Sequence, residues 1–238
     1  MGIDVSVILP TYCERDNIGR LISAIEDGLL AAGWEVEILV VDDNSPDCTA
    51  QAVDEYQPRH GSIVKCIVRT EERGLATAIK CGLREVHGDR IVVMDTDFNH
   101  SPANLPEMVR QLDDYDLVIG SRFVKGGGME ERRRYWFSLL YNLLIQFILF
   151  QNIRDSLSGF FAIRRAPLFT LDMDAVFYGY GEYFIRLTYL ARQRGLKILE
   201  VPVFYTLRQY GFSKSNLLSM IYNYTRCALE LRFKKGSL

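Results

Sequence analysis

Residues 4–43, DVSVILPTYCERDNIGRLISAIEDGLLAAGWEVEILVVDD, contain the pattern that decides the fold. The two ends of this stretch, 4–10 and 36–43, are short runs of β-branched and other apolar residues, which are typical of strands. Between them, apolar residues return every three or four positions, as on one face of a helix. That face consists of Ile18, Leu21, Ile22, Ile25 and Leu29. The stretch therefore predicts a strand–helix–strand unit.

The same alternation continues along the chain to residue 121. Further strands are predicted at 63–69, 90–95 and 116–121, and helices at about 74–86 and 104–112. Strands that alternate with helices form parallel sheets, and the nearly continuous apolar runs fit strands covered on both faces. We therefore predict an α/β fold with a mostly parallel, Rossmann-like sheet flanked by helices.

After residue 122 the pattern of the chain changes. The predicted elements are an apolar helix at 137–150, strands at 158–165 and 197–205, a helix near 181–194 and a C-terminal helix. We expect one α/β domain over residues 1–215, which includes the apolar helix. A C-terminal amphipathic helix and basic tail are expected over 216–238.

Composition narrows the function classes. Lys and Arg number 28 and Asp and Glu 30, so the net charge of the 238 residues is −2, which argues against a nucleic-acid partner. The five cysteines show no paired spacing, and we expect them to be reduced in a protein that faces the cytoplasm. The longest apolar stretch, 137–150, is shorter than the roughly 20 residues of a membrane-spanning helix.

Polar residues follow the predicted strands, at the edge where open parallel sheets bind ligands. Tyr12 follows the first strand, Asp43 ends the second, and Arg122 follows the fifth. The fourth ends on Asp95, with Asp97 two positions on. Residues two apart on a strand share a face at about 6.5–7 Å, so both carboxylates can converge on one ligand, and carboxylates suit Mg²⁺ or Mn²⁺. The competing interpretation is that Asp97 and Asn99 cap the helix at 104, and that Asp43 caps the helix after its own strand.

Seven stretches of the chain, taken in order, carry a resemblance to a known family. They are VILPTYCERDNI, VVDDNSPD, GLATAIKCGL, VVMDTDFNHSP, GSRFVKGGG, DSLSGFFAIRR and EVPVFYTLRQYGFSK. Together they resemble the motif series of family 2 glycosyltransferases, and within it the dolichyl-phosphate mannose synthases and their polyprenyl-phosphate relatives. The resemblance implies a GT-A fold. It also implies transfer of a sugar from a nucleotide donor to a lipid phosphate, with inversion at the anomeric carbon.

The resemblance assigns roles to individual residues. The donor nucleotide would be bound by Pro10, Tyr12, Glu14, Val41, Asp43, Asp95, Thr96, Arg208 and Lys214. Asp97 would bind a Mg²⁺ or Mn²⁺ ion that bridges the donor diphosphate. Asp95 would hold ribose or sugar and share the metal, and Asn99 would be a weaker ligand. Asp95, Asp97 and Arg122 form the implied catalytic group.

The acceptor phosphate is expected at a second group of residues. Arg122, Arg134 and Ser138 match the basic site that binds it in the family, although Arg132–Arg134 also read as a solvated run of charge. One position departs from the family. A carboxylate is often found six residues after a Gly–aromatic pair, but here that pair is Gly179-Tyr180 and the sixth position is Ile185. Glu182 is the nearest acid.

The apolar stretch 137–150 suggests how the chain meets a lipid acceptor. Ser138, Asn142 and Gln146 recur every four residues and form one polar stripe on an otherwise apolar helix. Such a helix can lie in the membrane interface; the alternative is burial in the core or in an oligomer interface. We expect a peripheral protein on the cytosolic face of the plasma membrane or endoplasmic reticulum, held there by itself or by a small membrane-anchoring subunit.

The reaction favoured by the motifs is mannose transfer from GDP-mannose to dolichyl or another polyprenyl phosphate. A UDP-sugar such as UDP-glucose is the alternative donor. A sugar nucleotidyltransferase is disfavoured because the first strand ends in Pro-Thr-Tyr rather than in a Gly-rich phosphate loop. A scaffold subunit without activity is disfavoured by the presence of Asp95, Asp97 and Arg122.

Overall fold

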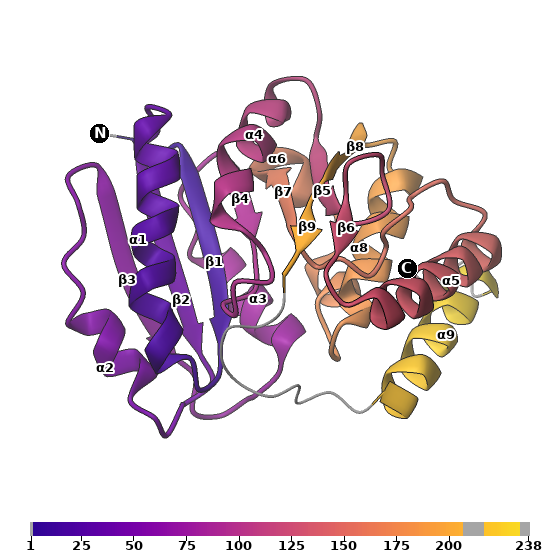
Figure 1. The fold of residues 1–238 in the computed structure, drawn as a ribbon, viewed down its shortest axis with the longest axis horizontal. Coiled ribbons are helices and arrows are strands. Elements are labelled where there is room, and N and C mark those ends of the chain that lie inside the picture. The colour runs from indigo at the N-terminus through magenta and orange to yellow at the C-terminus, as the bar shows by residue number, and fades with distance from the viewer. Residues whose placement is uncertain (1, 207–216, 234–238) are drawn as a thin grey trace.

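A computed structural model describes residues 2–206 and 217–233, and its centre is one seven-stranded sheet with the order β3-β2-β1-β4-β7-β5-β8 (Figure 1). Its strands are β1 Val5–Thr11, β2 Val36–Asp42, β3 Ser62–Val68, β4 Arg90–Val93, β5 Leu117–Ser121, β7 Phe161–Arg164 and β8 Ile198–Pro202. Six of them run parallel, and only β7 runs against its neighbours β4 and β5. The predicted mostly parallel α/β sheet is confirmed.

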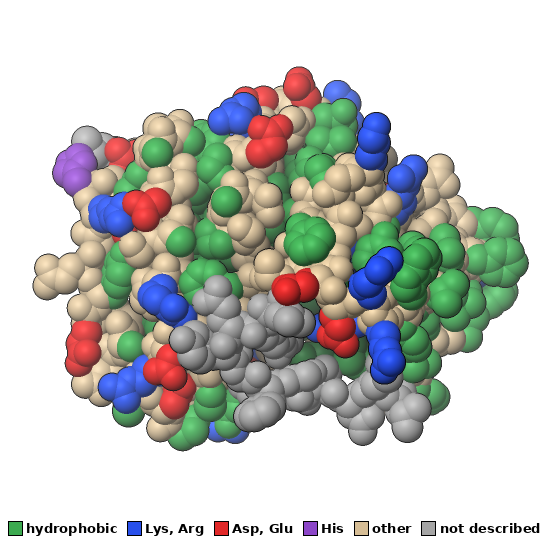
Figure 2. All heavy atoms as spheres, in the orientation of Figure 1, with side chains coloured by type: hydrophobic (Ala, Val, Ile, Leu, Met, Phe, Trp, Pro, Cys, Tyr) green, Lys and Arg blue, Asp and Glu red, His purple; other side chains and the backbone are tan. Residues whose placement is uncertain are grey.

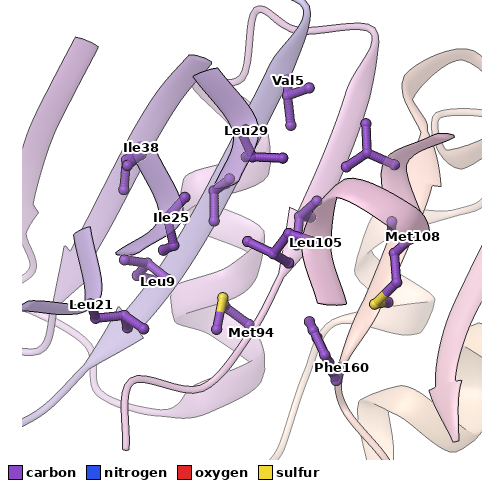
Figure 3. Close-up of a cluster of buried hydrophobic side chains, with 14 of the residues drawn as sticks. Val5, Leu9, Leu21, Ile25, Leu29, Ile38, Met94, Leu105, Met108 and Phe160 are labelled. Atoms are coloured by element: carbon purple, nitrogen blue, oxygen red, sulfur yellow. The ribbon is translucent and has the colours of Figure 1, made fainter. Parts of the chain in front are cut away.

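Helices cover both faces of this sheet. One face carries α1 Arg15–Ala31, α2 Thr49–Asp54 and α4 Leu105–Arg110, the last flanked by the 3-10 turns η1 Pro102–Asn104 and η2 Gln111–Asp113. The other face carries α3 Leu75–Arg84, α6 Arg165–Leu168, α7 Met173–Val176 and α8 Glu182–Gln193. Side chains of β1 alternate between the two layers: Val5, Val7 and Leu9 pack under α1, whereas Ile8 faces α3. Figure 3 shows the first of these clusters, where Leu21, Ile25 and Leu29 of α1 meet β1 and β2.

A further layer lies outside α8 and consists of α5 Arg132–Leu149 and α9 Leu217–Phe233. The two helices lie together at one end of the molecule (Figure 1). Ile145 and Leu149 of α5 pack with Ala228 of α9 and Ile185 of α8. The hydroxyl of Tyr141 donates to the backbone carbonyl of Ile221 over 2.8 Å and joins the pair. Among the described residues, no helix combines the length and apolar character that crossing a bilayer requires.

Two predicted elements differ in their bounds. The apolar helix predicted at 137–150 begins earlier, at Arg132, so Arg132–Arg134 form its first turn. The predicted strand at 197–205 divides into β8 and β9 Phe204–Tyr205, and β9 pairs with a strand that the pattern did not indicate, β6 Gly128–Met129. Val203 makes the crossing, since its N–H donates to Ser121 of the large sheet while its carbonyl accepts from Gly128 of the small one. Glycine-rich β6 has no apolar pattern by which it could be recognised.

Candidate functional site

The carboxyl ends of β1, β2 and β4 meet at one edge of the sheet. Thr11 of β1 is in register with Asp42 of β2, and Ile8 of β1 with Val93 of β4. Non-glycine residues with positive φ follow each of these strands: Cys13, Asn44, Cys48 and Phe98, at 59°, 54°, 65° and 61°. This conformation is unfavourable for side chains with a Cβ and concentrates at binding and catalytic sites. The strained backbone positions and the polar residues thus indicate a binding site at the same edge of the sheet.

The loops after β1 and β2 are fastened to each other. Backbone N–H groups of Cys13 and Glu14 donate to the hydroxyls of Ser45 and Thr49 over 2.8 and 3.0 Å. The Glu14 carboxylate accepts from the Asn17 amide at 2.9 Å. These contacts hold the predicted donor residues of the two loops on one side of the sheet edge.

The residues predicted to bind the base and ribose differ in how exposed their side chains are. Tyr12 is partly exposed, and the Arg73 guanidinium lies 5.1 Å above its ring centroid. Pro10 is also partly exposed, whereas Thr96 is buried. The Val41 side chain is fully buried in the core beneath α3, so of this residue only the backbone lies within reach of the edge. The donor contacts of these residues stay predictions.

Asp43 does not cap the helix that follows its strand. The N-cap residue of α2 is Cys48, and Asp43 instead accepts from Nε of Arg69 and from the N–H of Gly74, both at 2.7 Å. Arg69 also donates to the carbonyl of Gly74 over 3.0 Å. Asp43 therefore joins the end of β2 to the start of α3. No role was assigned to Arg69 from the sequence, although Arg69 is the last residue of the strand predicted at 63–69 and directly follows β3 in the structure.

Asp97 closes the turn after β4. One of its oxygens accepts from the N–H of Asn99 at 3.1 Å, and the other accepts from Nδ2 of Asn99 at 2.8 Å. The following helical turn has Ser101 as its N-cap residue, so neither Asp97 nor Asn99 caps the helix, and that alternative is wrong. Asp97 is 6% exposed, whereas the Asp95 side chain is 44% exposed. Asp95 is thus the more open carboxylate of the pair.

His100 is buried beneath the turn after β4 and contacts its backbone. Its Nδ1 accepts the backbone N–H of Asp95 at 2.9 Å, and its ring stacks on Phe160 with centroids 4.7 Å apart. Burial disfavours the charged ring and lowers the pKa of His100 to about 4. The neutral ring then carries its proton on Nε2, which lies 3.8 Å from the Asp95 carboxylate. His100 orients the backbone at Asp95 and adds no positive charge.

The predicted metal ligands offer two carboxylates and one amide. No cluster of three or more His, Cys, Asp or Glu side chains suited to a metal occurs within residues 2–206 and 217–233. Mg²⁺ commonly takes one or two protein carboxylates and completes its shell with substrate phosphates and water. Since the Asn99 amide turns its nitrogen to Asp97, its oxygen is the atom that can face a cation. The donor set fits a Mg²⁺ or Mn²⁺ ion that is bound together with a diphosphate.

Arg122 is held in a buried ion pair. Its Nε and Nη2 donate to the two oxygens of Asp155 over 2.8 and 2.6 Å, and its backbone N–H donates to the same group at 3.0 Å. Burial disfavours the charged guanidinium, but the Asp155 carboxylate outweighs burial and holds the pKa of Arg122 above its usual value. Asp155 was assigned no role in the sequence analysis, although it is the first residue of the DSLSGFFAIRR stretch. If Arg122 contacts a phosphate as predicted, it does so with a guanidinium that Asp155 already holds in place through Nε and Nη2.

The first turn of α5 adjoins this ion pair. The ring of Phe123 packs on Tyr135 with centroids 5.2 Å apart, which brings α5 to the end of β5. Arg134 is exposed and Ser138 is half-buried on this part of α5. The structure thus brings Arg122 and the start of α5 together. Arg208 and Lys214 lie outside the described residues.

Helix α5 is turned with its polar stripe inward. Asn142 is fully buried, and its amide donates to the Ser138 carbonyl at 3.0 Å and approaches Asp155 at 3.5 Å. The Gln146 amide donates to the carbonyl of Arg154 at 3.4 Å. The opposite side of the helix exposes large apolar side chains: Trp136, Phe137, Leu140, Leu143, Leu144 and Phe147. Figure 2 shows hydrophobic side chains gathered at the end of the molecule where α5 lies. We call these six residues the outer face of α5.

Known proteins resemble this chain in sequence and in fold. The family model described as glycosyl transferase family 2 matches residues 6–170. Dolichol-phosphate mannosyltransferase of Pyrococcus furiosus is 36% identical over 215 residues; the match covers 88% of this chain but only 58% of that protein. Undecaprenyl-phosphate mannosyltransferase of Micrococcus luteus is 33% identical over 239 residues and is covered to 96%, with 97% of this chain.

A solved structure extends the likeness to the fold. Glucosyl-3-phosphoglycerate synthase of Mycobacterium tuberculosis, in complex with Mn²⁺, UDP and glucosyl-3-phosphoglycerate, superposes with a TM-score of 0.72 at 22% identity. The superposition covers 97% of this chain and 80% of that one. The fold is therefore the GT-A fold, as expected. Since the family model matches residues 6–170, which include every strand of the seven-stranded sheet except β8 and the first residue of β1, the chain belongs to glycosyl transferase family 2.

Proposed function

We propose that the protein transfers mannose from GDP-mannose to dolichyl or another polyprenyl phosphate at a membrane surface. The observation that carries this proposal is the orientation of α5. Its polar stripe contacts the loop that contains Asp155, the ion-pair partner of Arg122, while its outer face is apolar and exposed. A helix of this kind can lie in a bilayer interface and bring a lipid phosphate beside the sheet edge. The named relatives, which are mannosyltransferases of dolichol and undecaprenyl phosphate, support the same acceptor class and sugar.

The acceptor chemistry explains the choice of side chains. A phosphate monoester has a second pKa near 6 and is already an anion at pH 7, so it attacks without a general base. An oxygen of this phosphate bonds to the anomeric carbon of mannose as the bond to the departing GDP breaks, with inversion. The two reacting groups are both anionic, and Arg122, Arg134 and Ser138 would bind and orient the acceptor against that repulsion.

The donor side has a different task. Asp97, with Asp95 and Asn99, would hold the divalent cation, which neutralises charge on the leaving diphosphate when it is bound. Asp43 and Tyr12 would bind the nucleoside, and Asp95 would reach ribose or sugar. Asp95 and Asp97 are ligands in this scheme and not bases.

The direct test is a transfer assay with defined lipids. Purified protein is incubated with vesicles that contain a polyprenyl phosphate, with labelled GDP-mannose or UDP-glucose, and with Mn²⁺, Mg²⁺ or a chelator. We expect a mannosyl phospholipid from GDP-mannose, formed with either metal and lost with the chelator. Transfer from UDP-glucose alone would change the sugar but keep the reaction class. Absence of a glycolipid product with both donors would refute the proposed function.

A second test concerns the membrane. We expect the protein to float with polyprenyl-phosphate vesicles in a density gradient, more strongly when the vesicles contain anionic lipid, because Arg132, Arg133 and Arg134 are exposed beside the outer face. Failure to bind any vesicle would instead favour the expected small membrane-anchoring subunit. Co-expression with candidate membrane proteins would then identify it.

A further inference from the structure

Tyr205 is a buried aromatic residue that contacts both halves of the candidate site. It is the last residue of β9 and is 6% exposed, and no role was assigned to it from the sequence. Its ring centroid lies 5.0 Å from that of His100, and the guanidinium carbon of Arg122 lies 4.9 Å from the same ring centroid. These two neighbours belong to the turn after β4, where the donor diphosphate is expected, and to the end of β5, where the acceptor phosphate is expected.

On the donor side, β9 supports the turn that carries the aspartate pair. The His100 ring packs against Tyr205, while its Nδ1 accepts the backbone N–H of Asp95 at 2.9 Å. The next residue, Thr206, donates its hydroxyl to the carbonyl of Phe98 over 3.4 Å, and Phe98 has a φ of 61°. A non-glycine residue in this conformation depends on its surroundings to hold it there. Tyr205 and Thr206 therefore support the predicted metal-binding turn at two points.

On the acceptor side, the same ring lies against the Arg122 guanidinium. Asp155 binds two nitrogens of that group, and the Tyr205 ring is within cation–π distance of it. The Tyr205 hydroxyl donates to the carbonyl of Ser158 over 3.1 Å and lies 2.9 Å from the Ser158 hydroxyl. Ser158 belongs to the loop that also contains Asp155. The Tyr205 ring is therefore fixed relative to the ion pair as well as to the donor turn.

Transfer between two bound anions requires that the attacking oxygen and the anomeric carbon be placed exactly. A misplacement of about 1 Å can lower a rate about a hundredfold. We propose that Tyr205 is a positioning residue, whose ring fixes the distance between the donor turn and the acceptor arginine. Its buried ring touches neither substrate and acts through His100 and Arg122. This assignment rests on the proposed function, because it requires a donor and an acceptor bound in one site.

A ring that only fills space in the core leads to a different expectation. Tyr205 belongs to the same hydrophobic cluster as Leu9, Met94 and Phe160. If packing were its only role, replacement of Tyr205 would lower the melting temperature and leave the turnover of the folded enzyme unchanged. If the ring positions the two halves of the site, kcat falls even where the protein is fully folded. Stability and turnover are therefore measured separately.

The test uses the transfer assay with the donor that the wild type accepts, at a temperature where every variant is folded. Tyr205→Leu removes the ring, and Tyr205→Phe keeps the ring but removes the hydroxyl. The matched control is Tyr56→Leu, which removes a tyrosine that packs on the same cluster and whose hydroxyl donates to Glu26 of α1. We expect Tyr205→Leu to lower kcat about tenfold to a hundredfold, while KM for donor and acceptor stays within about twofold. Tyr205→Phe should recover most of the kcat, and Tyr56→Leu should keep the wild-type kcat, although both should melt at a lower temperature.

Several results would overturn the assignment. They are an unchanged kcat in Tyr205→Leu, an equal loss in Tyr56→Leu or in Tyr205→Phe, and a loss that appears in KM rather than in kcat. If Tyr205→Leu does not fold, Tyr205→Met replaces it, because the flexible methionine side chain can fill the space of the ring. Absence of a glycolipid product from the wild type with every donor would refute the proposed function, and the assignment with it. Since that failure needs no substitution, the two failures are distinguishable.

Discussion

At the scale of the residue, Asp97 has both a structural and a proposed chemical role. Its carboxylate closes the turn with Asn99, and it is the predicted metal ligand. We expect Asp97→Ala to lower transfer about 10³-fold, because the metal supplies several kcal/mol of charge stabilisation. The variant should also lose metal-dependent nucleotide binding, measured by calorimetry. Circular dichroism should remain that of the wild type, and Asp114→Ala, an exposed acid, should keep full activity. Near-normal turnover of Asp97→Ala would contradict the site.

The ion pair of Arg122 and Asp155 allows stability and activity to be separated. Removal of one partner leaves a buried charge, so Asp155→Ala should lower the free energy of unfolding by about 3–5 kcal/mol. The double variant Arg122→Met/Asp155→Leu should recover most of this loss, since it leaves no charge unpaired. We expect the double variant to remain inactive in the transfer assay. A stable and active double variant would make the pair purely structural.

At the scale of the element, the outer face of α5 is the feature to test. Leu140 and Phe147 are 64% and 74% exposed, and the ring contact of Phe147 is with Phe150, which is itself exposed, so their replacement removes little buried packing. Each such side chain contributes about 1.5–3 kcal/mol when it is buried in an apolar phase. We expect Leu140→Asp/Phe147→Asp to lose vesicle flotation and lipid transfer, while nucleotide binding stays unchanged. Ile63→Asp, on the exposed edge strand β3, is the matched control. If it impaired flotation equally, the effect would not be specific to α5.

The sequence predicted helices and strands correctly where a single hydrophobic periodicity, that of a helix or that of a strand, dominates the segment. The pairing of Ser138, Asn142 and Gln146 on one stripe was correct, and so was the position of polar residues at the strand ends. Sequence alone left open which side of α5 faces inward, since an apolar face can pack on a core or on a membrane. The partners of Asp43 and Arg122 could not be predicted either. Both bonds join segments separated by 26 to 33 residues, and the second depends on the loop before the antiparallel strand β7.

At the scale of the whole molecule, buried polar residues occur at both ends of the sheet. The candidate site lies at the carboxyl ends, whereas Glu37 lies near the amino ends, buried and in register with Ser6. Burial raises the pKa of Glu37, but hydrogen bonds from Ser6 and His87 outweigh it, so the net pKa is lowered. An acid with a lowered folded pKa stabilises the protein above its unfolded pKa of about 4.3 and loses this contribution as pH falls through the folded value.

We therefore expect Glu37→Gln to lower the free energy of unfolding by about 2 kcal/mol at pH 7. The difference from the wild type should shrink as the pH falls below the unfolded pKa of about 4.3 and then through the lower folded pKa, as measured by urea unfolding at each pH. Transfer activity at pH 7 should be unaffected at temperatures where both proteins are folded. A pH-independent difference would mean that the carboxylate charge is not the source of the stabilisation.

Under the proposed function, the outward side of α5 would also decide whether the enzyme meets its acceptor in a plane or in bulk solution. With this helix in the interface, enzyme and polyprenyl phosphate diffuse in a plane, and their encounter depends on the number of acceptors per unit of lipid area. Addition of inert phospholipid at a fixed bulk amount of acceptor should then slow transfer, in proportion to the fall in mole fraction. A water-soluble, short-chain phosphate acceptor should show no such surface dilution. The rate of transfer in a cell would then depend on the density of the acceptor lipid within one membrane leaflet and not on its total amount.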